Sequence, residues 1–175
     1  MGPKTVCVPL ISRSQIDAAV RRLATELNRD YRDKNPLLIG ILKGSFVFMA
    51  DLVRCLEFPL EIDFARLSSY TGKVTSGKVR VVFGPRTPVR GRDVLLIEDI
   101  IDTGLSASHF IKYIEKRQPA SLKLCALAEK PERHRVVVNI DYLGFTVPDK
   151  FLVGCGLDWD EKYRNLPDIC ALEEE

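Results

Sequence analysis

Asp93-Val-Leu-Leu-Ile-Glu-Asp-Ile-Ile-Asp-Thr-Gly-Leu-Ser106 is the stretch around which the rest of this chain is organised. Its apolar residues Val94 to Ile97 run directly into the acidic pair Glu98 and Asp99. A short continuous apolar run is typical of a strand buried on both faces, as in a parallel sheet covered by helices. Ligands of open α/β sheets bind at the carboxyl ends of the strands. The carboxylates that follow this strand, with Asp102 as the third, therefore indicate a binding site at that end.

The flanking segments alternate between strand-like and helix-like patterns. Apolar residues recur with helical spacing from Ile16 to Leu27, which predicts a helix that begins at Ser14, with Asp17 at capping-box spacing. Strands alternating with helices predict an α/β fold with a mainly parallel sheet. Further helix faces are expected at 46–56 and 110–114, and strands at 37–42, 60–67, 79–83, 122–127, 136–143 and 151–153.

Two other segments are not part of this alternation. Residues 68–78 are small and polar and contain glycine, which is typical of a long hairpin loop or a mobile flap. Residues 173–175 form an acidic tail that we expect to be solvated.

Composition limits the class of protein. A chain of 175 residues with 46% apolar and 29% charged content is typical of one globular domain, so residues 1–175 are expected to fold as a unit. A formal charge of +2 gives little support for nucleic-acid or membrane partners. The five cysteines form no C-x-x-C pair, which argues against a zinc site or disulfide framework and favours a reducing cytoplasm. No apolar run approaches the ~20 residues that cross a membrane.

The turn from Asp102 to Ser106 has the features of a phosphate site. Gly104 allows the backbone to approach a ligand closely, and the start of the following helix offers unpaired N–H groups with positive dipole character. These features suit a phosphate monoester. The spacing differs from that of a nucleotide-hydrolysing P-loop, so ATP hydrolysis is not indicated.

Bare carboxylates beside a phosphate would repel it, which leaves two arrangements for Glu98 and Asp99. They can accept hydrogen bonds from a sugar diol, or they can hold Mg²⁺, which prefers oxygen ligands. A phosphate turn beside such a pair suits a ribose 5-phosphate unit. The alternative is that these acids are helix caps or surface salt-bridge partners.

A second anion site is indicated at Lys43-Gly44-Ser45, which follows another predicted strand. Glycine permits close approach, the lysine supplies a point charge, and the helix start that follows adds donors. Two anion sites on one edge of a sheet suit a substrate that is phosphorylated at both ends. Alone, the lysine could equally be a solvated surface residue.

Residues Val94 to Gly104 resemble the phosphoribosyl-pyrophosphate (PRPP) signature of type I phosphoribosyltransferases. The surrounding motifs are similar in order and spacing to hypoxanthine(-guanine) phosphoribosyltransferases, and the resemblance extends from about Pro9 to Ala171. It implies the type I fold, with a small hood built from the terminal segments and a flexible flap. The motifs that carry it further are Leu42-Lys43-Gly44-Ser45, Leu67-Ser68-Ser69-Tyr70, Lys130 and the segment from Phe151 through Asp158 and Arg164.

The resemblance implies an enzyme of purine salvage. Such enzymes transfer the 5-phosphoribosyl group of PRPP to hypoxanthine, giving IMP, or to guanine, giving GMP, and release pyrophosphate in a Mg²⁺-dependent reaction. Because members of the family form dimers and tetramers, a homo-oligomer is also expected. Two alternatives stay open: a PRPP-sensing regulator of the same fold that binds nucleic acid, and a receiver-like module with a phospho-accepting aspartate.

Site roles follow from the same resemblance. It implies Asp102 as the general base, Lys130 as the donor to the purine 6-oxygen, and Phe151 as the ring that stacks on the base. A lysine can only donate, so it rewards a 6-oxo group over a 6-amino group. The resemblance further implies that the 5′-phosphate contacts Asp102, Thr103, Gly104, Leu105 and Ser106, with Ser106 where threonine is common, and that pyrophosphate contacts Lys43, Gly44 and Arg164. It implies that the purine contacts Asp158 and the carbonyl of Leu152, and that the metal is held by Glu98, Asp99 and Asp158. The residues implied for the flap are Ser69 and Tyr70. A non-proline cis peptide is implied in the loop containing Lys43.

Overall fold

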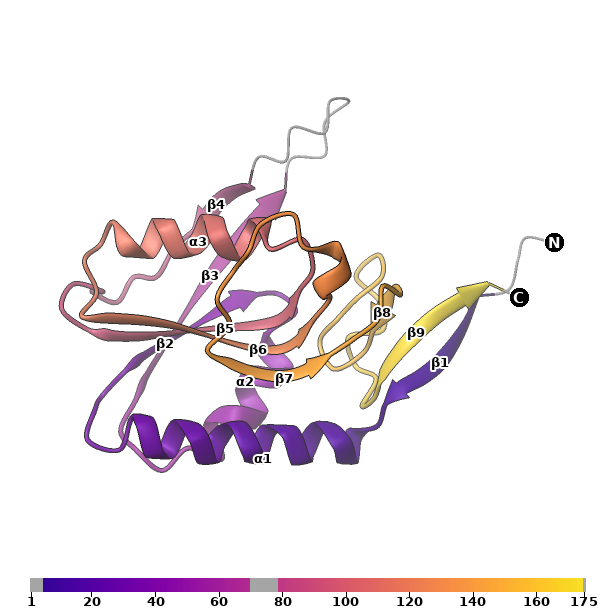
Figure 1. Cartoon of the computed structure of the whole chain (residues 1–175), viewed down its shortest axis with the longest axis horizontal. Coiled ribbons are helices and arrows are strands. Elements are labelled where there is room, and N and C mark those ends of the chain that lie inside the picture. The colour runs from indigo at the N-terminus through magenta and orange to yellow at the C-terminus, as the bar shows by residue number, and fades with distance from the viewer. Residues whose placement is uncertain (1–4, 70–78, 175) are drawn as a thin grey trace.

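The computed structural model describes residues 5–69 and 79–174. A six-stranded sheet in the order β4-β3-β2-β5-β6-β7 lies at the centre, and a three-stranded sheet in the order β1-β9-β8 stands beside it (Figure 1). The strands are β1 (Thr5–Ile11), β2 (Leu37–Leu42), β3 (Glu61–Ser69), β4 (Val79–Phe83), β5 (Asp93–Ile101), β6 (Ser121–Glu129), β7 (Tyr142–Thr146), β8 (Leu152–Val153) and β9 (Ile169–Glu174). The helices are α1 (Arg13–Asp30), α2 (Phe46–Val53) and α3 (Leu105–Glu115), with a short 3₁₀ helix η1 (Pro131–Arg133).

The large sheet is mainly parallel, as the sequence predicts. β2 pairs in parallel with β3 and β5, and β6 pairs in parallel with β5 and β7. Only β4, at one edge, runs antiparallel to its described neighbour β3. The strand order reverses between β2 and β5, and in such sheets the crevice beyond the carboxyl ends of the two diverging strands binds ligands.

Helices cover both faces of this sheet, with α1 and α2 on one face and α3 on the other (Figure 1). Alternate residues of β5 therefore enter different parts of the core. Leu95 and Ile97 pack in the cluster formed with α1 and α2, whereas Val94 and Leu96 pack in the cluster formed with α3. Burial on both faces explains why the strand is continuously apolar.

The small sheet is the expected hood. β1 pairs antiparallel with β9, and β9 pairs antiparallel with β8, so segments from both ends of the chain build it. β9 continues to Glu174, so the acidic tail begins within a strand. Glu173 is nevertheless solvated as expected, because its side chain is 45% exposed, and it forms an ion pair with Lys150 at 2.8 Å. β1 was not predicted.

Two local predictions were wrong. α1 is capped by Ser12, whose side chain and that of Gln15 form a reciprocal capping box, so the helix starts earlier than Ser14. The strand expected at 136–143 is β7, displaced to Tyr142–Thr146. The valines before it have no strand to pair with: the side chain of Val137 is 95% exposed, and the N–H of Val136 donates to the carbonyl of Thr103.

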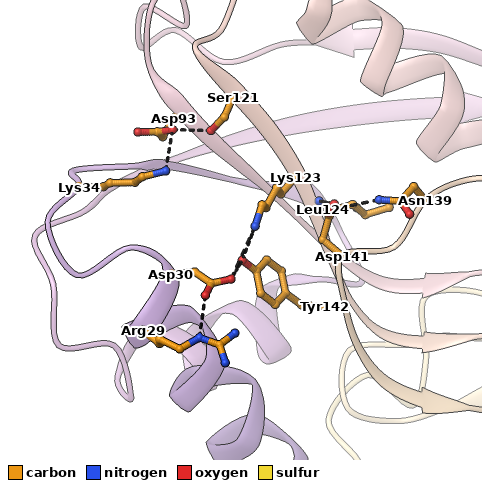
Figure 2. A network of polar contacts seen from close by, with 10 residues as sticks. All are labelled: Arg29, Asp30, Lys34, Asp93, Ser121, Lys123, Leu124, Asn139, Asp141 and Tyr142. Atoms are coloured by element: carbon orange, nitrogen blue, oxygen red, sulfur yellow. Dashed lines mark hydrogen bonds and ion pairs between the residues drawn. The ribbon is translucent and has the colours of Figure 1, made fainter.

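A polar network lies at the edge of the large sheet where its parallel strands begin, opposite the crevice (Figure 2). The hydroxyl of Tyr142 donates to Asp30 at the end of α1, and Lys123 donates to the same hydroxyl. Asp93 accepts from Lys34 and from Ser121. These contacts fasten α1 to β5, β6 and β7 at the end of the sheet remote from the crevice. Among the described helices, none is long and apolar enough to span a membrane.

Candidate active site

The acidic pair at the end of β5 forms the floor of the crevice. Glu98 is buried, and its pKa lies well above the ordinary value because of burial and the adjacent charge of Asp99. Burial likewise raises the pKa of Asp99 to about 6. The protein interior thus favours the protonated acids, and a divalent cation at this edge would favour the ionised forms.

The loop after β2 lies directly against this floor. A methyl group at Gly44 would stand 1.6 Å from Oδ2 of Asp99, and one at Gly156 would stand 2.1 Å from the carbonyl oxygen of Gly44. Glycine at these two positions allows the backbone of the loop after β2 to lie against the carboxylate of Asp99 on one side and the backbone at Gly156 on the other. The peptide bond between Leu42 and Lys43 is cis, as the resemblance implies.

The predicted phosphate turn leads into α3 as expected. Gly104 has φ +77° and precedes the first residue of α3, Leu105. A side chain at Gly104 would meet the carbonyl oxygen of Val136 at 2.5 Å, and the carbonyl of Thr103 accepts from the N–H groups of Arg135 and Val136. The turn is therefore held from behind by the loop after η1, and the N-terminus of α3 remains available to an anion.

Asp102 forms an ion pair with Arg133. Its Oδ1 lies 2.5 Å from Nε of Arg133, and Nη1 of Arg133 lies 3.2 Å from Oδ1 of Asp149. The guanidinium thus bridges two acids, one after β5 and one before β8.

A cavity of about 580 Å³ opens beside Asp102. Lys130 is almost fully buried at 7% exposure, and its backbone N–H donates to the backbone carbonyl of Ile101. Phe151 is 54% exposed on the same cavity, so it offers a free aromatic surface. The lining residues are Asp99, Ile100, Asp102, Lys130, Arg133, Asp149, Lys150, Phe151, Leu152, Leu157 and Asp158.

The loop after β8 carries the charges that face the floor. Nη1 of Arg164 donates to the carbonyl of Gly156 at 2.8 Å, while Nη2 lies 2.9 Å from Oδ1 of Asp158 and 3.0 Å from Oε2 of Glu161. Oε1 of Glu161 lies 2.8 Å from Nζ of Lys43. The loop is thereby linked to the loop after β2 by an ion pair as well as by the glycine contact.

The donor set fits Mg²⁺ held largely by a substrate. In the described part of the chain, no group of three histidine, cysteine or acidic side chains is arranged to surround a metal ion. Mg²⁺ in phosphate-handling sites is bound through one or two carboxylates, with phosphates and water as the other ligands. Asp99 and Asp158, which line one cavity, are carboxylates of that kind.

The structure brings together most residues singled out from the sequence. Asp99, Asp102, Lys130, Phe151, Leu152 and Asp158 line one cavity, and Gly44 contacts Asp99. Glu98 is buried beneath them. Ser69 ends β3, and Tyr70 lies outside the described residues. Sequence reasoning missed Arg133, Asp149 and Glu161, although five of the seven residues from Asp158 to Arg164 are charged.

Comparison with known proteins agrees with this geometry. Residues 12–160 match the phosphoribosyl transferase domain family. The chain is 45% identical to the hypoxanthine-guanine phosphoribosyltransferase of Bacillus subtilis, covering 94% of this chain and 92% of that protein. It is also 45% identical to the bifunctional protein TilS/HprT of Listeria innocua over 95% of its own length, but it spans only 26% of that protein.

Solved structures give the same result. The crystal structure of a hypoxanthine-guanine phosphoribosyltransferase from Bacillus anthracis superimposes with a TM-score of 0.90 at 38% identity, covering 97% of this chain and 99% of that one. A hypoxanthine phosphoribosyltransferase from Staphylococcus aureus also gives 0.90, at 37% identity, over 94% and 90% of the two chains. This chain therefore belongs to the phosphoribosyl transferase family, among the hypoxanthine-guanine phosphoribosyltransferases.

Proposed function

We propose that this protein transfers the 5-phosphoribosyl group of PRPP to hypoxanthine and to guanine, forming IMP and GMP and releasing pyrophosphate, as an enzyme of purine salvage. The observation that carries the proposal is that Lys130, an almost fully buried lysine, lines the same cavity as Asp102. A buried donor and an acid in one base-sized cavity suit recognition of a 6-oxopurine and removal of its ring proton. Family membership supports the same reaction.

The donor end of the site suits PRPP. The 5′-phosphate would bind to residues 102–106 at the start of α3, where N–H groups and the helix dipole favour an anion. The ribose diol would donate to Glu98 and Asp99. Pyrophosphate would contact Gly44, Lys43 and Arg164, and the positive charges of the lysine and the arginine would stabilise the negative charge that develops on the leaving group.

The acceptor end suits a 6-oxopurine. Lys130 would donate to the 6-oxygen, and a 6-amino group would leave the ammonium of this lysine unpaired, which disfavours adenine. Phe151 would stack on the base, while the carbonyl of Leu152 and the region of Asp158 would face its other edge. Asp102 would accept a ring proton as the new bond forms.

Mg²⁺ completes the proposal as the cofactor, with Glu98, Asp99 and Asp158 as the carboxylates that would hold it, directly or through water. When bound, it would neutralise charge on the pyrophosphate oxygens. We also propose that the chain acts as one domain, forms a dimer or tetramer and works in the cytoplasm. Sedimentation analysis of the purified protein tests the oligomeric state.

A parallel assay tests the function. PRPP and Mg²⁺ are incubated with hypoxanthine, guanine, xanthine or adenine, and nucleotide products are separated by chromatography. We expect IMP and GMP, little AMP, and no product after chelation of the metal. If no base gave a nucleotide while the protein bound RNA or DNA in a salt-sensitive way, the proposal would be wrong and the regulatory alternative correct.

A further inference from the structure

Glu161 occupies the positive charges that the proposed function assigns to pyrophosphate. Its Oε1 lies 2.8 Å from Nζ of Lys43, and its Oε2 lies 3.0 Å from Nη2 of Arg164. One carboxylate thus pairs with cations from two different loops. The hydrogen bonds from Lys43 and Arg164 hold the pKa of Glu161 below its ordinary value, so the side chain is an anion at neutral pH.

The backbone presents this carboxylate toward the site. Trp159 and Lys162 exchange two backbone hydrogen bonds, which closes a tight turn around Glu161. The N–H of Glu161 donates to Oδ2 of Asp158 at 2.9 Å, and φ is +62° at Glu161 and +51° at Asp160. Side-chain-bearing residues rarely adopt this left-handed conformation, so the turn is held in it by its contacts.

The other acid on Arg164 is arranged differently. Asp158 contacts the guanidinium and also accepts from the N–H of Glu161, and its side chain is 31% exposed. Glu161 is 60% exposed and reaches the cations from the solvent side. An incoming anion could therefore displace the Glu161 carboxylate without disturbing Asp158.

We propose that Glu161 is an internal competitor for diphosphate, which holds Lys43 and Arg164 in place before substrate binds and leaves them when the diphosphate of PRPP enters. The inference rests on the proposed function. It adds Glu161 as a residue that sets the affinity for diphosphate, which is a role for an acidic side chain at a site that binds an anion. The ligand class is a diphosphate, free or as part of PRPP.

This role predicts a gain of binding on removal of the charge. Exposed ion pairs contribute little to stability, so Glu161→Gln should fold normally. The variant removes the carboxylate charge of Glu161 from Lys43 and Arg164, although Arg164 keeps its ion pair with Asp158. It also removes a repulsive charge from the path of the ligand. If Glu161 instead served only to hold Lys43 and Arg164 in position for the ligand, Glu161→Gln would bind diphosphate more weakly, because the two cations would become disordered.

Titration calorimetry with inorganic pyrophosphate tests the proposal on the wild-type protein and on Glu161→Gln, with and without Mg²⁺. We expect the variant to bind pyrophosphate about two- to five-fold more tightly, the range that corresponds to loss of an exposed ion pair. The KM for PRPP should fall by a similar factor. Asp160→Asn is the matched control: it removes the same charge from the same turn, and Asp160 has no hydrogen-bond or ion-pair partner among the side chains that the structure describes.

Unchanged or weaker pyrophosphate binding by Glu161→Gln would overturn the inference, as would an equal gain in Asp160→Asn, which would show a general charge effect. The binding measurement needs no turnover. If the wild-type protein made no nucleotide from any base, the proposed function would fail, while the comparison of pyrophosphate affinities would still decide the role of Glu161.

Discussion

Nε of Arg133 lies 2.5 Å from Oδ1 of Asp102, the acid to which the proposed mechanism assigns the ring proton of the purine. The same guanidinium contacts Asp149 at 3.2 Å. In the described part of the chain, Oδ2 of Asp102 has no protein donor, so this oxygen is the one that can face a base. The pairing fixes which side of the carboxylate is offered to the cavity.

Replacing Asp102 by asparagine tests its role as base. The variant keeps the size of the side chain but cannot accept a proton, and general base catalysis contributes roughly 10²–10⁴-fold. We expect kcat to fall within that range, with PRPP binding retained. Steady-state kinetics together with direct PRPP binding measure the two effects. Near-normal turnover with both substrates bound would contradict the assignment.

Arg133→Met should lower kcat more than it raises the KM for hypoxanthine, because the carboxylate of Asp102 would lose its orientation. The expected loss is about ten-fold, since charge-assisted hydrogen bonds contribute roughly 1.5–3 kcal/mol and this one is part-exposed. Arg133→Lys should restore part of the rate. Arg135→Met is the control, a neighbouring exposed arginine for which no side-chain partner is found in the described chain. Equal losses in both methionine variants would point to a general charge effect.

Lys130→Gln should reduce the preference for 6-oxopurines. An amide can both donate and accept, so it no longer leaves an unpaired ammonium when adenine binds. We expect the ratio of kcat/KM for hypoxanthine over adenine to fall by roughly ten-fold or more. Lys150→Gln removes the same charge from the rim of the same cavity and should leave the ratio unchanged. An unaltered preference in Lys130→Gln would exclude this lysine as the reader of the 6-position.

Gly44→Ala should disrupt the floor of the donor site. The added methyl would stand 1.6 Å from Oδ2 of Asp99, and overpacking of this kind costs roughly 1–3 kcal/mol. We expect a lower melting temperature and loss of PRPP binding. Gly91→Ala is the control, because no atom lies within 4 Å of the added methyl, so only the positive φ of Gly91 (+71°) opposes the side chain. It should lose about 1 kcal/mol of stability and bind PRPP normally.

The polar network at the other edge predicts an acid-dependent stability. Hydrogen bonds from Tyr142 and Arg29 lower the pKa of Asp30, so this acid stabilises the fold above its unfolded pKa of ~3.9 and loses that contribution as the pH falls through its folded value. Asp30→Asn should cost about 1 kcal/mol at pH 7, and the difference from wild type should shrink below pH ~3.5. Urea denaturation at pH 7 and pH 3 measures both. A difference independent of pH would mean that the charge is not involved.

Strands were predicted best from the sequence where the local residue pattern agrees with the position of the strand in the folded sheet. The strands at 37–42 and 79–83 match the bounds of β2 and β4, because β2 is a continuous apolar run and β4 is rich in β-branched residues and ends before Gly84 and Pro85. The strand at 136–143 was displaced, since β-branched residues without a neighbouring strand do not extend a sheet. β1 could not be found locally: it contains Pro9, and it is stabilised by β9, which lies near the other end of the chain.

The same reasoning applies to the site. The acids after β5 and the glycine turn could be predicted because a single strand and the helix start after it position them. Arg133, Asp149 and Glu161 could not, since their partners come from loops whose mutual approach no local pattern specifies. The resemblance supplied Lys130 and Phe151, which a local pattern would assign to the surface and to the core.

The hood has a practical consequence for anyone who labels or shortens this protein. The carbonyl of Phe151 accepts from the N–H of Leu172, and β9 is itself held by β1, so the wall behind the proposed purine cavity is clamped by β1 and β9. We expect a fluorophore or affinity handle joined next to β1 or β9 to disturb that clamp. Purine affinity, and not only yield or solubility, is therefore the property by which tagged preparations should be compared with untagged ones.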